Sequence, residues 1–148
     1  MKIIKQISDK LVIQELSELT EFKAAYPLVR QLRQTLSQAV YLDFVQKIPG
    51  YRALVIVNQG KIISYAGFAE QINMYEGKHL FIYELLTNEA HRDLGYGKLL
   101  VETIEQEGKA RGCQMLVLTS GLARKEAHRF YLEKMGMTQS SLVFRKDL

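Results

Sequence analysis

The sequence of 148 residues has no tryptophan, one cysteine and two prolines. A single cysteine, Cys113, excludes a disulfide within the chain, which is typical of proteins from a reducing cytoplasm. No apolar run approaches the length of a membrane span, and residues 1–6 carry charges where a signal peptide needs an apolar stretch. We therefore expect a cytoplasmic protein that has no membrane partner.

The charge balance is also modest. Lysine and arginine number 20 against 16 acidic residues, a net charge of +4. The basic residues are scattered and form no stripe that could follow a nucleic-acid backbone, so we expect no nucleic-acid partner. A small positive excess is still favourable for an anionic cofactor. The length suits one domain, and because no repeat or low-complexity linker interrupts it, we expect residues 1–148 to form a single domain.

Hydrophobic periodicity predicts an α+β fold, with a mixed, mostly antiparallel sheet flanked by helices. Strands are expected over residues 11–16, 52–57, 62–69, 80–86, 115–119 and 141–145. Helices are expected over residues 21–37, 39–47, 97–111 and 123–135. Pro27 would remove a backbone bond inside the first helix, so its start is expected nearer Ala24. The helical crossover before residues 115–119 predicts that this strand runs parallel to residues 80–86.

The stretch His91–Lys98 joins an expected strand to an expected helix. Gly95 and Gly97 would let the backbone turn sharply and bring its amides close to a ligand. The helix that follows adds free N–H groups and the positive end of its dipole, which together favour phosphate. Arg92 and Lys98 would add positive charge on either side. This loop is therefore predicted to hold a pyrophosphate.

Other glycine-loop motifs do not fit these residues. A Walker-type loop requires Ser or Thr after Gly97-Lys98, but Leu99 follows. A dinucleotide fingerprint requires a third glycine where Leu100 stands. The remaining alternative is a tight strand-to-helix connection whose charges are incidental.

Two stretches together resemble the GNAT superfamily, the acetyl-CoA-dependent N-acetyltransferases. Arg92-Asp93-Leu94-Gly95-Tyr96-Gly97 fits the loop of that superfamily, which has Arg or Gln, two free positions, Gly, one free position, then Gly or Ala. Ala127–Met137 fits its later helix, in which an alanine, a tyrosine and a closing glycine recur. The resemblance implies a GNAT-like acyl-CoA N-acyltransferase fold and an acyltransferase that uses acetyl-CoA as co-substrate and no metal.

The resemblance also implies a set of cofactor-binding residues. The pyrophosphate of coenzyme A would be held mainly by the backbone amides of Arg92, Asp93, Leu94, Gly95, Tyr96, Gly97 and Lys98. Backbone groups of Leu85, Leu86 and Thr87 would face the pantetheine arm, and one amide would polarise the thioester carbonyl. Ser120 could line the opposite side. Arg124 stands where the family commonly has an asparagine that contacts the cofactor, and it could reach a phosphate instead.

Two residues are catalytic candidates. Tyr131 matches the family tyrosine that donates to, or hydrogen-bonds, the coenzyme A sulfur; a phenol is protonated at neutral pH and can serve. The alternative is a core tyrosine beside Phe130. Glu84 occupies a strand position that is often acidic in the family, and apolar neighbours could raise its pKa enough for it to accept a proton. It could equally point to solvent or pair with a lysine.

The expected function is transfer of an acetyl group from acetyl-CoA to a primary amine by direct attack in a ternary complex. The alternative is a non-catalytic acyl-CoA-binding sensor or interaction module. Acceptor choice is expected from residues 35–51 and 73–78, where Tyr41, Asp43, Phe44 and Glu76 could hold a cationic amine or be ordinary surface. The acceptor could be a small-molecule or peptidyl amine, and a homodimer is possible.

Overall fold

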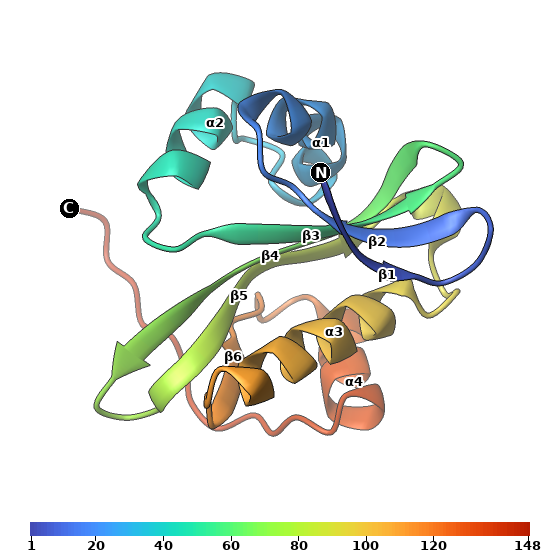
Figure 1. Cartoon of the computed structure of the whole chain (residues 1–148). Helices are drawn as coiled ribbons and strands as arrows, with labels where there is room; N and C mark the ends of the chain where they lie inside the picture. The colour runs from blue at the N-terminus through green and yellow to red at the C-terminus, as the bar shows by residue number, and fades with distance from the viewer. The chain divides into compact units, whose positions relative to one another are not determined.

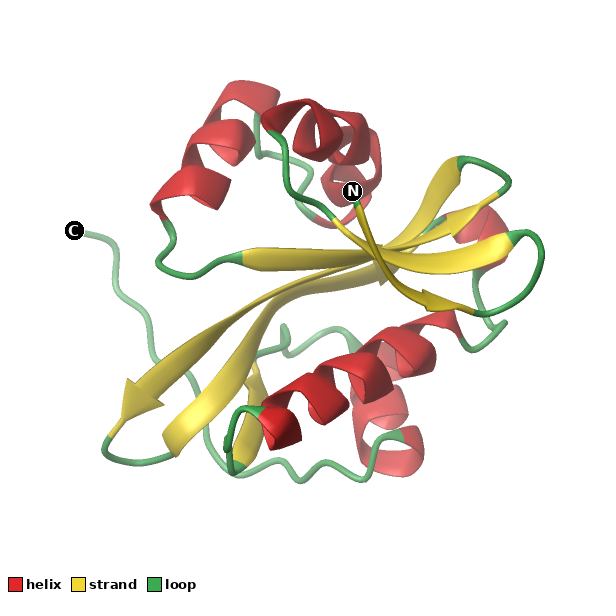
Figure 2. Cartoon of the chain, viewed as in Figure 1, coloured by secondary structure: helices red, strands yellow, loops and turns green.

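The computed structural model describes residues 1–148, which form two compact units, residues 1–117 and residues 118–148. The first unit is built around a β-sheet (Figure 1). Helices α1 (Leu19–Leu32) and α2 (Gln38–Lys47) cover one face of this sheet, and α3 (Tyr96–Ala110) covers the other (Figure 2). None of the helices is long and apolar enough to cross a membrane.

The sheet has six strands whose spatial order follows the sequence. The strands are β1 (Lys2–Gln6), β2 (Leu11–Glu15), β3 (Arg52–Asn58), β4 (Lys61–Asn73), β5 (Gly77–Thr87) and β6 (Met115–Leu118). Each neighbouring pair from β1 to β5 is antiparallel. The predicted α+β class with a mostly antiparallel sheet is thus confirmed, while the parallel direction of β6 stays a prediction.

Local chemistry explains the first two helices. The carboxylates of Glu18 and Glu21 form a capping box that starts α1 at Leu19. Pro27 is accommodated inside this helix, so the expected start near Ala24 was wrong. The helix also ends at Leu32 and not near residue 37, because Ser37 caps α2 by accepting the Val40 amide at 3.2 Å.

The core of the first unit lies between the sheet and the two helices α1 and α2. Its buried side chains include Phe22, Val29, Tyr41, Val55 and Tyr65. On the opposite face, α3 buries Leu100, Val101 and Ile104. Both faces of the central strands are therefore covered, which explains why β3 and β4 are buried along most of their length.

Other elements differ from the sequence-based expectations. Strand β1 was missed, and a single 3₁₀ turn, η1 (Glu89–His91), precedes the glycine loop. In the second unit, the predicted helix is α4 (Lys125–Arg129) followed by a π-helical turn, η2 (Phe130–Lys134). The predicted strand over residues 141–145 was wrong, because this segment forms no regular structure and its Phe144 side chain is 89% exposed.

Candidate active site

The loop between β5 and α3 has the backbone geometry of a tight strand-to-helix junction. The Asn88 side chain accepts the Ala90 amide at 3.0 Å and starts the 3₁₀ turn. Two left-handed positions follow, Asp93 with φ 64° and Gly95 with φ 83°. Gly97 was expected to share this role, but it lies in the first turn of α3 and has no left-handed backbone.

The most informative property of this loop is its free amides. From Arg92 to Lys98, no backbone N–H donates to a backbone or side-chain acceptor, and the first bond of the new helix runs from the Leu99 amide to the Gly95 carbonyl at 3.1 Å. Free amides at a helix N-terminus carry partial positive charge and favour an anion. The loop can therefore bind a phosphate group through its backbone.

Side-chain charge contributes less to this loop than expected. Arg92 Nε donates to the Thr87 carbonyl at 3.3 Å, so the guanidinium folds back onto the end of β5. Lys98 Nζ lies 3.8 Å from Glu102 Oε1 one turn along α3. Both side chains are exposed. The amides of Asp93, Leu94 and Tyr96 have no intramolecular acceptor. We therefore expect an anion to bind the backbone amides of this loop more than its two basic side chains.

The end of β5 presents two amides on its side away from β4. The Asn88 amide bonds to the Ile63 carbonyl at 2.8 Å, and Tyr65 is the partner of Leu86 in the ladder. Because bonded and non-bonded pairs alternate in an antiparallel ladder, the Leu86 amide faces β4, whereas those of Leu85 and Thr87 face the other way. Only β6 neighbours that other edge, and its four residues begin next to the Gln114 amide, which bonds to Lys78. The amides of Leu85 and Thr87 thus point away from β4, on the side where the contact with β6 begins seven residues before Leu85, at Lys78.

Glu84 belongs to β5, next to an irregularity in the β4–β5 ladder. Gly67 pairs with Glu84, but the next residue, Phe68, pairs with Ile82, so Tyr83 is an extra residue in β5. The Glu84 side chain is only 17% exposed. Its Oε1 accepts a hydrogen bond from the Tyr51 hydroxyl at 2.6 Å.

Burial is the main influence on the pKa of Glu84. Desolvation raises the pKa of this carboxyl, and the Tyr51 hydrogen bond and the Arg33 charge only partly oppose the rise. Arg33 Nη2 lies 3.8 Å from Glu84 Oε2 and donates to the Tyr83 carbonyl at 2.7 Å. The Glu84 side chain therefore neither points to solvent nor pairs with a lysine, the two alternatives considered from the sequence. It is a shielded carboxyl whose raised pKa suits proton transfer.

Sequence reasoning missed the side chains around Glu84. Tyr51, Tyr65 and Arg33 are far from it in sequence, and nothing in the local pattern of the chain connects them. Gly67 did carry a signal, because an isolated glycine within a strand indicates a bulge or a close approach. Here both occur, since a Cβ at Gly67 would lie 2.0 Å from the Tyr51 hydroxyl oxygen.

The remaining predicted site residues belong to the second unit. Tyr131 is half-buried in the π-helical turn, with its ring edge-on to Phe130 at 5.4 Å between centroids. Burial raises the pKa of Tyr131, and the Arg124 charge opposes the rise. The phenol is therefore protonated at neutral pH. Arg124 is exposed before α4, and Ser120 Oγ is buried without a hydrogen-bond partner. The approach of these three residues to the loop stays a prediction.

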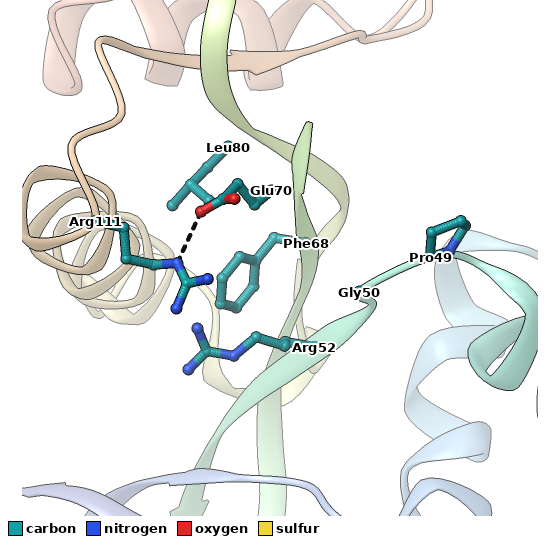
Figure 3. A pocket seen from close by; sticks show the side chains of 7 residues that line it. All are labelled: Pro49, Gly50, Arg52, Phe68, Glu70, Leu80 and Arg111. Carbon is teal, nitrogen blue, oxygen red and sulfur yellow. Dashed lines mark hydrogen bonds and ion pairs between the residues drawn. The ribbon is translucent and has the colours of Figure 1, made fainter. Parts of the chain in front are cut away.

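A cavity of the first unit lies elsewhere. It has a volume of about 270 Å³ and is lined by Pro49, Gly50, Arg52, Phe68, Glu70, Leu80 and Arg111 (Figure 3). Its two guanidinium groups are already occupied: Arg111 Nε donates to Glu70 at 2.9 Å, and Arg52 binds Glu15 and Glu107. None of the predicted catalytic or cofactor-binding residues lines it. We interpret this cavity as part of a structural ion-pair network.

The segments expected to choose the acceptor are partly unsuited to that role. Tyr41 is 3% exposed and belongs to the core, so it cannot contact an amine directly. Asp43 pairs with Lys47 at 2.9 Å on the surface of α2. Phe44 is 49% exposed, and Glu76 lies at the tip of the β4–β5 hairpin. Phe44 and Glu76 thus remain candidates for acceptor contacts.

Comparisons with known proteins identify the family of the chain. The acetyltransferase (GNAT) family model matches residues 16–137. The uncharacterized N-acetyltransferase YhdJ of Bacillus subtilis is 34% identical, over 92% of this chain and 98% of its own length. An aminoalkylphosphonate N-acetyltransferase of Salmonella typhimurium is 24% identical over the full length of both chains.

A solved structure extends the agreement to three dimensions. The aminoglycoside N-acetyltransferase AAC(6')-Iy in complex with CoA superposes with a TM-score of 0.81 at 14% identity, over 98% of this chain and 100% of that chain. At this identity the likeness shows the fold alone, and that fold is the GNAT fold predicted from the two sequence stretches. The family match and the relative at 34% identity carry the further conclusion: the chain belongs to the acetyltransferase (GNAT) family and is an acyltransferase.

Proposed function

We propose that the protein transfers an acetyl group from acetyl-CoA to a primary amine by direct attack within a ternary complex. The observation that carries this proposal is the run of free amides from Arg92 to Lys98 at the start of α3. Such a run suits the pyrophosphate of coenzyme A, which needs several donors at once. The AAC(6')-Iy structure was solved with CoA, which supports the same donor here.

The reaction assigns a task to each group. Glu84 takes one proton from the acceptor ammonium, and the resulting amine attacks the thioester carbon, forming a C–N bond. The Leu85 or Thr87 amide stabilises the developing oxyanion. When the C–S bond breaks, Tyr131 gives its proton to the departing thiolate and regains one, through solvent, from the nitrogen of the new amide.

The acceptor is expected to be a small-molecule or peptidyl amine. The similar proteins support an amine but not one kind of amine, since they include an aminoalkylphosphonate N-acetyltransferase and an aminoglycoside N-acetyltransferase. A buried carboxyl such as Glu84 fits this chemistry because it can accept a proton from an ammonium group that must lose it before attack.

The test is release of free thiol from acetyl-CoA against a panel of primary amines, with the Glu84→Gln protein as comparison. We expect amine-dependent thiol release by the wild type, reduced at least a hundredfold in the variant. Binding of acetyl-CoA without release on any amine of a broad panel would favour the non-catalytic acyl-CoA-binding module instead.

A further inference from the structure

The hydroxyl groups of three tyrosines form consecutive hydrogen bonds that lead from Glu84 into the core. The Tyr51 hydroxyl lies 2.8 Å from that of Tyr65, which lies 3.2 Å from that of Tyr41. Tyr65 is 0% exposed and Tyr41 3% exposed. We call Tyr51, Tyr65 and Tyr41 the tyrosine series. They come from three separate places in the sequence and converge between the sheet and α2.

The order of donors in the tyrosine series follows from the charge of Glu84. An ionised carboxylate only accepts, so the single Tyr51 proton is donated to Glu84 Oε1. Tyr51 must then accept from Tyr65, and Tyr65 from Tyr41. Each hydroxyl proton is thus directed toward the carboxylate, and hydrogen bonds arranged head to tail in this way polarise and strengthen one another.

The backbone keeps space for this arrangement. A Cβ at Gly67 would lie 2.0 Å from the Tyr51 hydroxyl oxygen and 2.5 Å from Glu84 Oε1. Any other residue at this position would separate the pair. The bulge at Tyr83 brings the neighbouring ring into the same place, with the Tyr51 and Tyr83 ring centroids 5.9 Å apart.

The two oxygens of Glu84 are left in different states. Oε1 is engaged by Tyr51, whereas Oε2 has no hydrogen bond and only the guanidinium of Arg33 at 3.8 Å. We propose that Tyr51, supported by Tyr65 and Tyr41, is a positioning residue that fixes the Glu84 carboxylate so that Oε2 takes the proton from the acceptor ammonium. This inference rests on the proposed function.

The proposed step moves one proton from the acceptor ammonium to Glu84 Oε2. An N–H bond of the ammonium breaks, its electron pair stays on nitrogen, and an O–H bond forms at Oε2, leaving Glu84 neutral. The groups that face this carboxyl are Arg33 after α1, Tyr51 before β3, Tyr65 and Gly67 on β4, and Tyr83 on β5. Tyr41 on α2 acts only through Tyr65.

The test titrates Glu84 directly in the Tyr51→Phe protein. Carbon NMR of protein labelled at glutamate side-chain carboxyls follows the midpoint, with the Glu84→Gln protein identifying the resonance. Because the Tyr51 hydrogen bond lowers the pKa of Glu84, its loss should raise the midpoint by about one pH unit. The acidic limb of the kcat/KM profile for the best amine of the panel should move up equally, while the acetyl-CoA Kd stays unchanged.

Tyr26→Phe is the matched control. Its hydroxyl lies in the same core, near Tyr41, but donates to the Leu36 carbonyl at 2.7 Å, so its loss should leave the midpoint unchanged. Tyr65→Phe interrupts the series one step further in and should shift the midpoint less, in the same direction; it decides the matter if Tyr51→Phe does not fold. A Glu84 midpoint unchanged in these variants would overturn the inference.

The two proposals fail separately. The NMR titration needs no acceptor, so a shifted midpoint supports positioning by Tyr51 whatever the amine panel gives. If Glu84→Gln retained full turnover while Tyr51→Phe shifted the midpoint, Glu84 would not be the base, and the assignment of Oε2 would be overturned with it. A different outcome would reject the positioning role of Tyr51 alone. In that outcome Glu84→Gln is inactive, while the Tyr51→Phe protein keeps the wild-type pH dependence of kcat/KM and the wild-type Glu84 midpoint.

Discussion

Among single residues, Glu84 is a buried carboxyl whose proposed role as a base has a cost in stability. Its carboxyl is shielded by Tyr51 and Gly67, and burial raises its pKa above the ordinary value of 4.5. A raised pKa means that the folded protein binds this proton more readily than the unfolded chain does. The carboxylate therefore opposes folding at neutral pH. This unfavourable contribution shrinks as the pH falls through the folded-state pKa and is gone below the unfolded-state pKa.

This sign gives a prediction for Glu84→Gln. The neutral amide should make the protein more stable than the wild type at pH 7, and the difference should shrink as the pH falls through the pKa of Glu84. Urea denaturation at several pH values measures the free energies of unfolding. Glu126→Gln, which changes an exposed carboxylate of α4, should show no such gain. The free energy of unfolding of Glu84→Gln minus that of the wild type should be larger at pH 7 than at low pH. A difference that is smaller at pH 7 would contradict a raised pKa for Glu84.

Tyr131 gives a second prediction for a single residue. Replacing it by Phe removes the proposed proton donor to the thiolate and keeps the packing with Phe130. We expect kcat to fall about a hundredfold, while the acetyl-CoA Kd remains unchanged. Tyr75→Phe, a change at an exposed side chain of the β4–β5 hairpin tip, should alter neither value. Unchanged turnover in the Tyr131→Phe protein would remove Tyr131 from the mechanism.

Among the elements, the loop that opens α3 gives the clearest separation between fold and function. Its free amides depend on the left-handed backbone of Gly95, where a Cβ would meet no other atom within 4 Å. Replacing Gly95 by Ala should therefore act through backbone strain alone. The expected cost is about 1 kcal/mol, and relief of this strain would turn the amides away from the position proposed for the pyrophosphate.

We predict that Gly95→Ala raises the Kd for coenzyme A about tenfold, as measured by calorimetry. Gly60→Ala provides the matched control, since Gly60 has φ 80° in the β3–β4 turn and equally open surroundings. The control should lose similar stability and keep the Kd of the wild type. Equal affinities in the two variants would contradict binding through the loop amides.

The elements also indicate where sequence reasoning reaches its limits. Apolar, β-branched runs gave β3, β4 and β5 closely, because these strands are buried and their patterns are strong. Residues 141–145 carry a similar run but form no strand, since β propensity needs a partner edge that a sequence does not supply. Pro27 misplaced the start of α1 because the capping box at Glu18 outweighed its cost.

On the scale of the whole molecule, an ion-pair network connects the sheet to α3. Arg52 of β3 binds Glu15 of β2 at 2.8 Å and Glu107 of α3 at 2.5 Å. Its guanidinium carbon lies 5.2 Å from the centre of the Phe68 ring, and Figure 3 labels both side chains. The hydrogen bond from Arg52 lowers the pKa of Glu107. Removing Arg52 would leave two half-buried carboxylates without their partner.

Arg52→Met should therefore lower the free energy of unfolding by about 2 kcal/mol, as measured by urea denaturation. Lys47→Met breaks an exposed pair with Asp43 on α2 and should cost no more than about 0.5 kcal/mol. Acetyl-CoA binding should survive in both variants, because this network lies outside the predicted cofactor loop. Equal stability losses would show that the network contributes no more than a surface pair.

The candidate site combines a loop that is continuous in sequence with contacts between distant segments, and only the first could be predicted from the sequence. The loop predicted to bind pyrophosphate is continuous in sequence, so Gly95 and the expected helix start were enough to predict it. The surroundings of Glu84 come from distant segments, and only the isolated Gly67 hinted at the contact with Tyr51. Contacts between distant segments leave no local pattern in a sequence, so the hydrogen bonds of Tyr51 with Glu84 and Tyr65 could be seen only in the structure.

The central claim is direct acetyl transfer in a ternary complex, and two-substrate steady-state kinetics test it most directly. Thiol release would be measured while acetyl-CoA and the best amine of the panel are varied together, with mass spectrometry of the acetylated amine. We predict reciprocal plots that intersect, together with one acetylated amine formed per thiol released. Parallel lines and an acetylated enzyme intermediate, or thiol release without acetylated amine, would contradict the account.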